Sequence, residues 1–252
     1  MIIAGTNFVL TYFALKGKVR KVFESEEFKY YFFGGFGLVI ALASIIIKFQ
    51  DPNLVTSIEH PQPYGEIESA FRHAAFQVSS ILTTTGFVTA DFTMWNSFAT
   101  MLMFSLFFIG GSAGSTAGGV KIVRHVVMIK NSLLEFKRLL HPNAIIPVRY
   151  NGVRVSKSIV FNILAFFILY MLIFICSSII LTFLGLDFES AIGAAASSLG
   201  NIGPAFGSVS PVNNFAHLSD LSKWFCSFLM LIGRLELFTV LFLLTPFFWK
   251  KN

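Results

Sequence analysis

The chain has 252 residues, of which 55% are hydrophobic and only 13% are charged. A soluble domain carries about 25% charged residues, so this composition cannot cover a water-soluble surface and indicates an integral membrane protein. The mean hydropathy of +0.72 agrees with that class. Both cysteines, Cys176 and Cys226, lie in apolar stretches, so the sequence predicts neither a disulfide framework nor a cysteine metal site.

Charge-free intervals predict the membrane-spanning helices, because a span needs about 20 apolar residues. In chain order they cover residues 30–47, 92–120, 158–186 and 224–249. Arg234 and Glu236 interrupt the last interval. Residues 1–15 are also uncharged, and we expect them to be the end of a helix whose beginning is absent. A signal peptide is the competing interpretation, but no basic region precedes this run and no small-residue cleavage site follows it.

Basic and acidic residues occupy alternate connections between the predicted spans. Lysine and arginine gather near residues 16–21, in the loop at 121–157 and at the C-terminus, whereas Asp91 and Asp187 lie in the other connections. The positive-inside rule therefore predicts that the basic loops and the C-terminus are cytoplasmic. The net charge of +6 follows from this topology, and we expect no nucleic-acid partner.

Two further stretches, residues 66–90 and 187–210, are too short to cross the membrane twice. Each starts with acidic residues, which favour a helix N-terminus. Each ends in a tract rich in Thr, Ser and Gly, SSILTTTGFVT at 79–89 and SSLGNIGPAFG at 197–207. The sequence therefore predicts a repeated unit: a helix, a short re-entrant helix, an extended tract with glycine, and a second helix.

Such tracts suit a path for cations. Non-helical backbone at membrane depth is tolerated where it is buried in protein or lines a water-filled path. Its carbonyl oxygens can replace the hydration shell of a cation. Gly86 and Gly203 are expected to adopt positive φ and turn carbonyls toward that path. The alternative is that these two glycines only end the helices as left-handed caps.

The same residues resemble a known family. The segments TTTGF at 83–87 and NIGP at 201–204 look like the third and fourth filter segments of the Trk/Ktr/HKT potassium transporter superfamily, and the TrkH-type branch fits best. Residues 110–124, 141–152 and 233–250 support the resemblance, which covers essentially the whole chain. In that family one chain holds four helix–pore helix–helix repeats around a central ion path.

The resemblance implies an all-α membrane protein of the bacterial cytoplasmic membrane, with potassium as substrate and no cofactor in this chain. It divides the chain into the end of a second-repeat helix with a cytoplasmic loop (1–29), the third pore repeat (30–130), a basic cytoplasmic loop (131–157) and the fourth pore repeat (158–252). The implied potassium-binding residues are Thr84, Thr85, Gly86, Phe87, Asn201, Ile202, Gly203 and Pro204. The fourth segment departs from a Thr-x-Gly pattern, which argues against coordination by side-chain hydroxyls in that quarter.

Residues 110–119 (GGSAGSTAGG) hold no side chain larger than threonine. The spacing of Gly110, Gly114 and Gly118 allows a GxxxG face for close helix packing. A phosphate-binding loop is a poor alternative, because its Gly-Lys-Ser/Thr ending is missing. Ten consecutive small residues make a poor helix, and the resemblance implies a broken helix whose loop gates the path beneath the filter. The implied gate comprises Gly110, Gly111, Ser112, Ala113, Gly114, Ser115, Thr116, Ala117, Gly118, Gly119 and Arg234.

Arg234 lies within the last apolar stretch, where a charge costs roughly 2.5–3.5 kcal/mol and should face a cavity or a partner. We expect it to donate hydrogen bonds to free carbonyls of residues 110–119. The alternative is that its side chain extends to the membrane interface. Glu236 lies about 200° further around a helix, so the two cannot form a simple pair on one face.

Three classes of function compete. The leading one is an ion-conducting subunit for potassium uptake. A membrane-embedded enzyme would need an intramembrane nucleophile and base, and none is visible. His73, His125 and His141 are interpreted as packing or loop residues, since no metal-ligand spacing surrounds them. The third class is a non-conducting membrane scaffold or regulatory remnant.

The chain carries two filter tracts, whereas a ring of carbonyls requires four quarters. We therefore expect a missing N-terminal half that holds the first two repeats, and we interpret the chain as a fragment. The resemblance also implies a homodimer and a cytosolic nucleotide-binding regulatory subunit of Rossmann type. The basic loop at 121–157 is a candidate docking surface for it, and the alternative is that this loop contacts only lipid headgroups.

Overall fold

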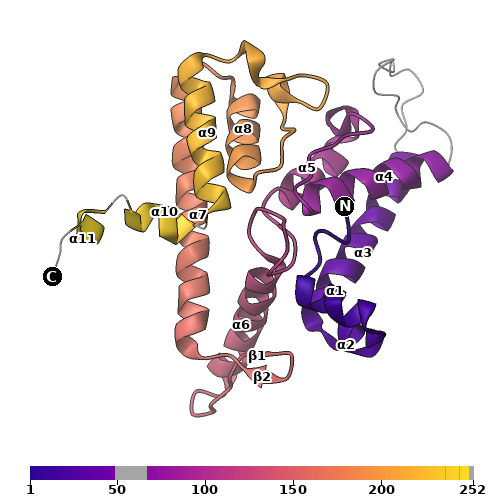
Figure 1. Cartoon of the computed structure of the whole chain (residues 1–252), viewed down its shortest axis with the longest axis vertical. Coiled ribbons are helices and arrows are strands. Elements are labelled where there is room, and N and C mark those ends of the chain that lie inside the picture. The colour runs from indigo at the N-terminus through magenta and orange to yellow at the C-terminus, as the bar shows by residue number, and fades with distance from the viewer. Residues whose placement is uncertain (49–66, 236, 244, 250–252) are drawn as a thin grey trace.

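The computed structural model describes residues 1–48, 67–235, 237–243 and 245–249. The chain is mostly helical, and its helices form two groups (Figure 1). One group consists of α3 (Glu26–Lys48), α4 (Ile67–Leu82) and α5 (Ser97–Leu106), and the other of α7 (Lys157–Phe183), α8 (Phe188–Gly200) and α9 (Asp220–Arg234). The all-α membrane fold predicted from the sequence is confirmed.

Among the described residues, two continuous helices are long and apolar enough to cross a membrane. They are Glu26–Ile46 within α3, with 21 residues, and α7, with 27 residues. Both were predicted from charge-free intervals, although α3 begins earlier and carries Glu26 and Glu27 in its first turn. Ser156 caps the start of α7, where its hydroxyl accepts a hydrogen bond from the Ile159 amide.

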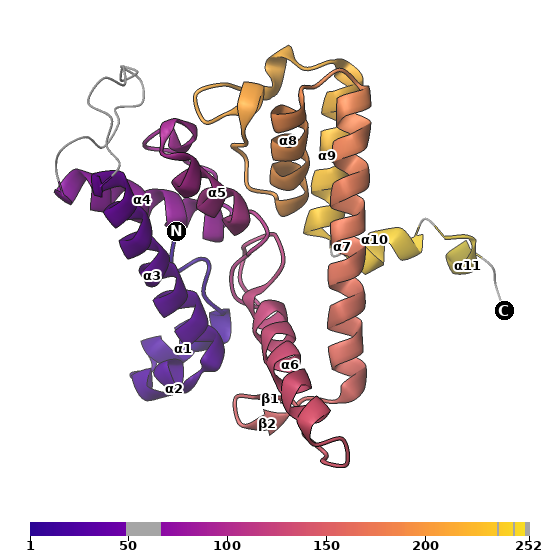
Figure 2. The same ribbon diagram turned by 180° about the vertical axis from the view of Figure 1, so that it is seen from behind.

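The two short helices predicted as re-entrant are α4 and α8. With 16 and 13 residues they are shorter than a span, and a non-helical tract follows each of them. Figure 2 shows α4 against α3 and α8 beside α7 and α9. Helix α8 is almost wholly buried from Ser190 to Gly200. Its alanine, glycine and serine side chains allow α7 and α9 to pack closely around it.

The predicted interval 92–120 is a broken helix, as expected. A 3-10 turn at Phe92–Met94 precedes α5, and α5 ends at Leu106. Residues 110–119 are non-helical, and the chain resumes as α6 (Ile122–Leu140). The glycines of this segment therefore do not form one face of a helix, and the GxxxG interpretation is wrong.

The interval 224–249, predicted as one span, is not a continuous helix in the described residues. Helix α9 ends at Arg234, and α10 (Leu237–Leu243) lies at 115° to it, followed by α11 (Pro246–Trp249). Two different attachments explain the change of direction. Arg234 contacts residues 110–119, whereas α10 buries Leu237 and Val240 with Phe166 of α7. Glu236 lies outside the described residues.

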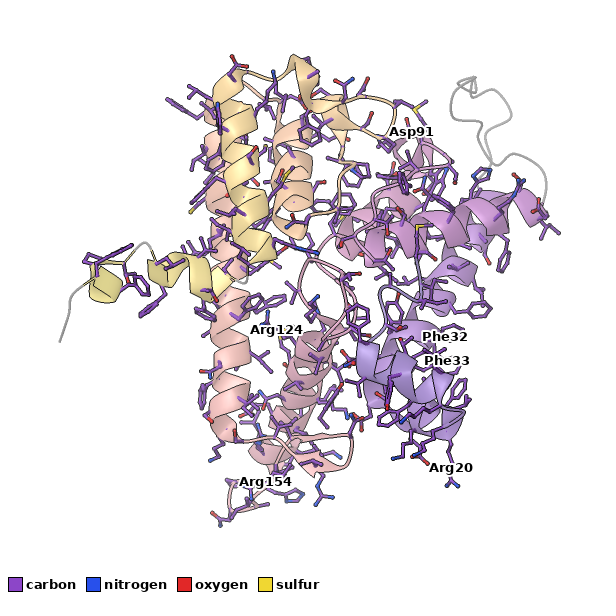
Figure 3. The ribbon with its side chains drawn as sticks, in the orientation of Figure 1. Arg20, Phe32, Phe33, Asp91, Arg124 and Arg154 are labelled. Carbon is purple, nitrogen blue, oxygen red and sulfur yellow. The ribbon has the colours of Figure 1, made fainter. Side chains whose placement is uncertain are left out.

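The end of the molecule that holds the C-terminal end of α6 also carries α1 (Phe8–Leu15), α2 (Val19–Glu24) and a hairpin of β1 (Arg149–Tyr150) and β2 (Val153–Arg154) (Figure 1). The hairpin was not predicted. In Figure 3, Arg20 and Arg154 lie toward this end, and Asp91 lies toward the opposite end. This arrangement agrees with the separation of charges along the sequence.

An aromatic cluster joins the two groups of helices. Phe206, from the tract after α8, lies 5.4 Å from Phe92 and 5.2 Å from Phe107 between ring centroids. All three rings belong to one buried core, which also includes Ile81 of α4 and Ile202. Short 3-10 turns at Gly207–Val209 and Phe215–His217 then lead to α9. The core thus holds the two tracts next to each other.

Candidate ion path and gate

The tract after α4 leaves the helix through one left-handed residue. Thr84 has φ of 50°, and Gly86 has φ of 79°. The Thr85 amide donates to the Ser80 carbonyl at 2.9 Å, and the Thr83 hydroxyl donates to the Ser79 carbonyl at 2.7 Å. These bonds satisfy carbonyls at the helix end, which otherwise lack partners.

The tract after α8 repeats this geometry. Asn201 has φ of 56° and Gly203 has φ of 121°. The Ile202 amide donates to the Ser197 carbonyl at 3.0 Å, at the same spacing as the bond from Thr85 to Ser80. The left-handed caps are therefore Thr84 and Asn201. The two filter glycines lie two residues beyond the caps, so the interpretation of Gly86 and Gly203 as helix caps is wrong.

The two tracts approach each other at their glycines. A Cβ atom on Gly86 would lie 2.2 Å from the carbonyl oxygen of Ile202, a distance that no side chain tolerates. A Cβ atom on Gly203 would lie 3.5 Å from Cα of Gly86. Glycine is therefore required at position 86 both for its positive φ and for this close approach. Phe87 is 69% exposed beside it, and Pro204 follows Gly203.

Residues 110–119, hereafter the gate loop, fold back on themselves. The Gly110 amide donates to the Val120 carbonyl at 2.8 Å, and the Ile122 amide donates to the Gly111 carbonyl at 3.1 Å. A Cβ atom on Gly110 would lie 2.3 Å from the carbonyl oxygen of Gly118. The glycines thus allow the two limbs of the loop to touch, and Gly114 and Gly119 have positive φ at its turns.

The gate loop contacts both predicted filter segments, residues 84–87 and 201–204, hereafter the filter tracts. The Gly118 amide donates to the Thr84 hydroxyl at 2.7 Å. A Cβ atom on Gly118 would lie 2.7 Å from the Gly200 carbonyl oxygen and 3.1 Å from Cβ of Asn201. Thr84 and Asn201 are the residues at which the two tracts begin. The loop therefore closes against the end of the filter nearest the pore-helix C-termini.

Arg234 reaches the gate loop as the sequence predicted. Its Nη1 atom donates to the Thr116 carbonyl at 2.7 Å. The neighbouring Gly233 packs against the fourth tract, because a Cβ atom there would lie 1.9 Å from the Leu199 carbonyl oxygen. The Asn201 side chain donates to the Met230 carbonyl at 3.0 Å. The end of α9 therefore contacts both the loop and the filter.

A cavity of about 340 Å³ lies beside the loop. Its lining includes the loop from Gly114 to Gly119, Phe166 and Arg234. Arg124, labelled in Figure 3, also lines it, and its guanidinium carbon Cζ lies 3.8 Å from the ring centroid of Phe166. The Lys121 ammonium donates to the Ala117 carbonyl. Lys121, Arg124 and Arg234 thus all line the cavity on this side of the loop.

Sequence reasoning missed two sets of contacts to the gate loop. The first set comes from residues 4–8, since the Ser112 amide donates to the Gly5 carbonyl at 2.9 Å and the Thr116 hydroxyl to the Ala4 carbonyl at 3.1 Å. The second comes from Glu27, which is 5% exposed and accepts a hydrogen bond from the Ala113 amide. The signal for Glu27 was a cluster of three acidic residues, Glu24, Glu26 and Glu27, beside the basic residues at 16–21.

No group of three or more His, Cys, Asp and Glu side chains that could hold a metal ion is present within the described ranges. The candidate ligands for a cation are therefore backbone and hydroxyl oxygens. Carbonyl oxygens suit monovalent ions, which they bind without a charged ligand. This chemistry agrees with the absence of charged residues from both tracts.

Comparison with known proteins assigns this arrangement to a family. The family described as TrkH, cation transport protein, matches residues 1–251. The chain belongs to this family. The Trk system potassium uptake protein TrkH of Escherichia coli (strain K12) is 34% identical over 252 residues, which are 100% of this chain and 49% of that protein. The protein of the same name from Halomonas elongata is 40% identical over 186 residues, covering 74% of this chain and 38% of that protein.

The fold agrees with a solved TrkH structure. The crystal structure of the potassium transporter TrkH from Vibrio parahaemolyticus superposes with a TM-score of 0.86 at 34% identity. The match covers 99% of this chain and 51% of that one. The chain therefore spans about half the length of the TrkH relatives it matches. The predicted resemblance to the TrkH branch is confirmed.

Proposed function

We propose that this chain forms the third and fourth quarters of a potassium-conducting path in the cytoplasmic membrane, within a Trk-type uptake system. The observation that carries the proposal is the convergence of the two filter tracts on each other and on one gate loop. Carbonyls of residues 84–87 and 201–204 would replace the hydration shell of the ion. The relatives are named as potassium uptake proteins, which supports potassium as the ion.

The gate loop, in this proposal, blocks the path beneath the filter until its contacts are released. Arg234 holds the loop at Thr116 and adds a positive charge close to the path. Glu27 holds Ala113 on the other limb. Opening requires that these bonds break together, so a regulatory subunit that binds at the cytoplasmic end would act by moving α6 or α9.

The orientation follows from charge. The basic segments near Arg20 and Arg154 and the C-terminus face the cytoplasm, where the positive-inside rule places them. The division into pore repeats at 30–130 and 158–252 belongs to the same proposal, as does a complementary half with two further repeats. A homodimer and a nucleotide-binding regulatory partner, docked on the basic loop at 121–157, complete it.

The test is uptake of radioactive rubidium, a congener of potassium, in cells that lack their own potassium uptake systems. The chain is expressed as a hybrid in which it replaces the matching half of the Vibrio parahaemolyticus transporter. We expect the hybrid to take up rubidium. The matched variant Gly86→Ala should abolish uptake, because its Cβ atom would meet the Ile202 carbonyl.

If the chain is a non-conducting scaffold or regulatory remnant, the hybrid will insert into the membrane at the normal level but take up no rubidium. That result would contradict the proposal. Expression of the chain alone is a second experiment. Uptake by the chain alone would support ion conduction and contradict the need for a complementary half.

A further inference from the structure

The serine at position 197 contacts both polar groups of one filter residue. Its hydroxyl donates to the Gly203 carbonyl at 2.9 Å and accepts from the Gly203 amide at 3.0 Å. Ser197 lies on α8 and is 2% exposed. The serine end of both bonds is therefore shielded from water, whereas Gly203 itself is exposed.

The third repeat offers an internal comparison. Ser80 lies six residues before Gly86, just as Ser197 lies six residues before Gly203. The carbonyl of each serine also accepts a hydrogen bond from the amide of the residue that follows the left-handed cap, Thr85 or Ile202. The Ser80 side chain is 1% exposed, however, and its hydroxyl has no hydrogen-bond partner in the described structure. In the described structure, the serine hydroxyl at this position therefore makes hydrogen bonds in the fourth repeat and none in the third.

This difference changes which oxygens are available to an ion. Within the described residues, no carbonyl from Thr84 to Val88 accepts a hydrogen bond. In the fourth tract the Gly203 carbonyl is directed at Ser197 on the pore helix. The Ile202 carbonyl faces the third tract instead, next to Cα of Gly86. The two quarters therefore present different sets of oxygens.

We propose that Ser197 is a positioning residue that withholds the Gly203 carbonyl from the permeating monovalent cation, so that Ile202 supplies the fourth-quarter ligand. The inference rests on the proposed function as a cation path. The filter is then asymmetric, because the Gly86 carbonyl is available to the ion whereas the Gly203 carbonyl is hydrogen-bonded to Ser197. Because selectivity depends on the number of coordinating dipoles, Ser197 then influences which cation is preferred.

The Gly203 carbonyl can be observed on its own, because the sequence contains a single Gly–Pro bond, between Gly203 and Pro204. Solid-state NMR of the hybrid transporter, with ¹³C at glycine carbonyls and ¹⁵N at proline in this chain's half alone, selects this carbonyl. We expect its resonance to stay constant when potassium replaces a large organic cation. In Ser197→Ala the resonance should shift without potassium, because the hydrogen bond is lost, and should then respond to potassium.

Two outcomes would overturn the inference. One is a potassium-dependent shift of the Gly203 carbonyl in the unmodified chain. The other is a Ser197→Ala variant whose Gly203 resonance is unchanged, or ignores potassium. Neither readout requires transport, so these results are distinguishable from failure of the rubidium uptake test, which concerns the proposed function. Ser197→Thr keeps a hydroxyl and should restore the original spectrum.

Uptake by the hybrid transporter gives a second readout. We expect Ser197→Ala to raise the ratio of rubidium to sodium uptake about two- to tenfold, the range that one neutral hydrogen bond controls. Ser80→Ala is the matched control, since its hydroxyl is buried without a partner, and it should leave the ratio unchanged. Equal ratios in Ser197→Ala and Ser80→Ala would contradict a role of Ser197 in selectivity.

Discussion

The side-chain hydroxyl of Thr84 accepts a hydrogen bond of 2.7 Å from the backbone amide of Gly118. Thr84 is the residue at which the first filter tract turns, and Gly118 belongs to the gate loop. The bond is possible only because Gly118 has no side chain, which leaves room for the Gly200 carbonyl on its other side. The filter and the loop are therefore in direct contact, and a movement of one must displace the other.

Thr84→Val tests this contact. Valine keeps the shape of threonine but cannot accept the Gly118 amide, and an unpaired buried amide costs about 1–3 kcal/mol. We expect the closed loop to be destabilised and resting rubidium uptake by the hybrid to rise. Thr84→Ser retains the hydroxyl and should behave like the unmodified protein. Equal uptake by the valine and serine variants would show that the bond does not hold the loop.

Arg234→Ala tests the contact from α9. A hydrogen bond from a charged donor contributes about 1.5–3 kcal/mol, and about 1.4 kcal/mol corresponds to a tenfold change in an equilibrium. We expect resting rubidium uptake to rise about tenfold or more, because the Thr116 carbonyl loses its partner and a positive charge leaves the path. Unchanged flux and unchanged regulation would remove Arg234 from the gate.

Glu27 provides a further test on the opposite limb of the loop. Glu27→Ala removes the acceptor of the Ala113 amide, and we expect higher resting uptake of rubidium for the same reason as in Thr84→Val. Glu27→Gln keeps an oxygen acceptor without the charge, so it should raise uptake less. The idea that Glu27 restrains the loop fails if the alanine variant transports at the original rate.

Gly233→Ala should destabilise the fourth repeat. The added Cβ atom would lie 1.9 Å from the Leu199 carbonyl oxygen and 2.8 Å from Nδ2 of Asn201, and backbone would have to move. Gly34→Ala is the control, since nothing lies within 4 Å of its Cβ position in α3 and alanine favours helix by about 1 kcal/mol. Thermal unfolding in detergent should show a lower midpoint for the first variant only.

The start of α8 predicts a dependence on acid. Hydrogen bonds from the hydroxyl and amide of Ser190 lower the pKa of the Asp187 carboxyl. The stability from the ionised cap is therefore complete above the unfolded pKa of about 3.9 and is lost as pH falls through the lower folded pKa. Asp187→Asn keeps the cap without titrating, so its thermal midpoint should change less below about pH 4. Parallel midpoints for both proteins would contradict this.

Charge-free length predicted α3 and α7, because a span is defined by composition alone. The pore helices were also predictable, since acidic starts and small-residue ends mark their limits. The bend after Arg234 was not predicted, because it depends on the packing of α10 against Phe166 of α7, which spacing along the chain cannot reveal. Glu27 and Ala113 meet across 86 positions for the same reason.

The hairpin was missed although its signal was present. Asn151 and Gly152 form a pair that strongly favours a two-residue turn, and both adopt positive φ, 48° and 77°. The strands are only two residues each, with Arg149 opposite Arg154. They are too short to show the alternation of polar and apolar residues that predicts a strand.

In the proposed function, the two filter tracts of this chain bind a potassium-sized cation where they meet. Thallium is such a cation and scatters X-rays anomalously, so crystals of the hybrid transporter soaked in a thallium salt test the claim directly. We predict an anomalous peak between the tracts, beside Gly86 and the Ile202 carbonyl, that potassium displaces. A map without a peak there, in crystals whose filter keeps the geometry described above, would contradict the account.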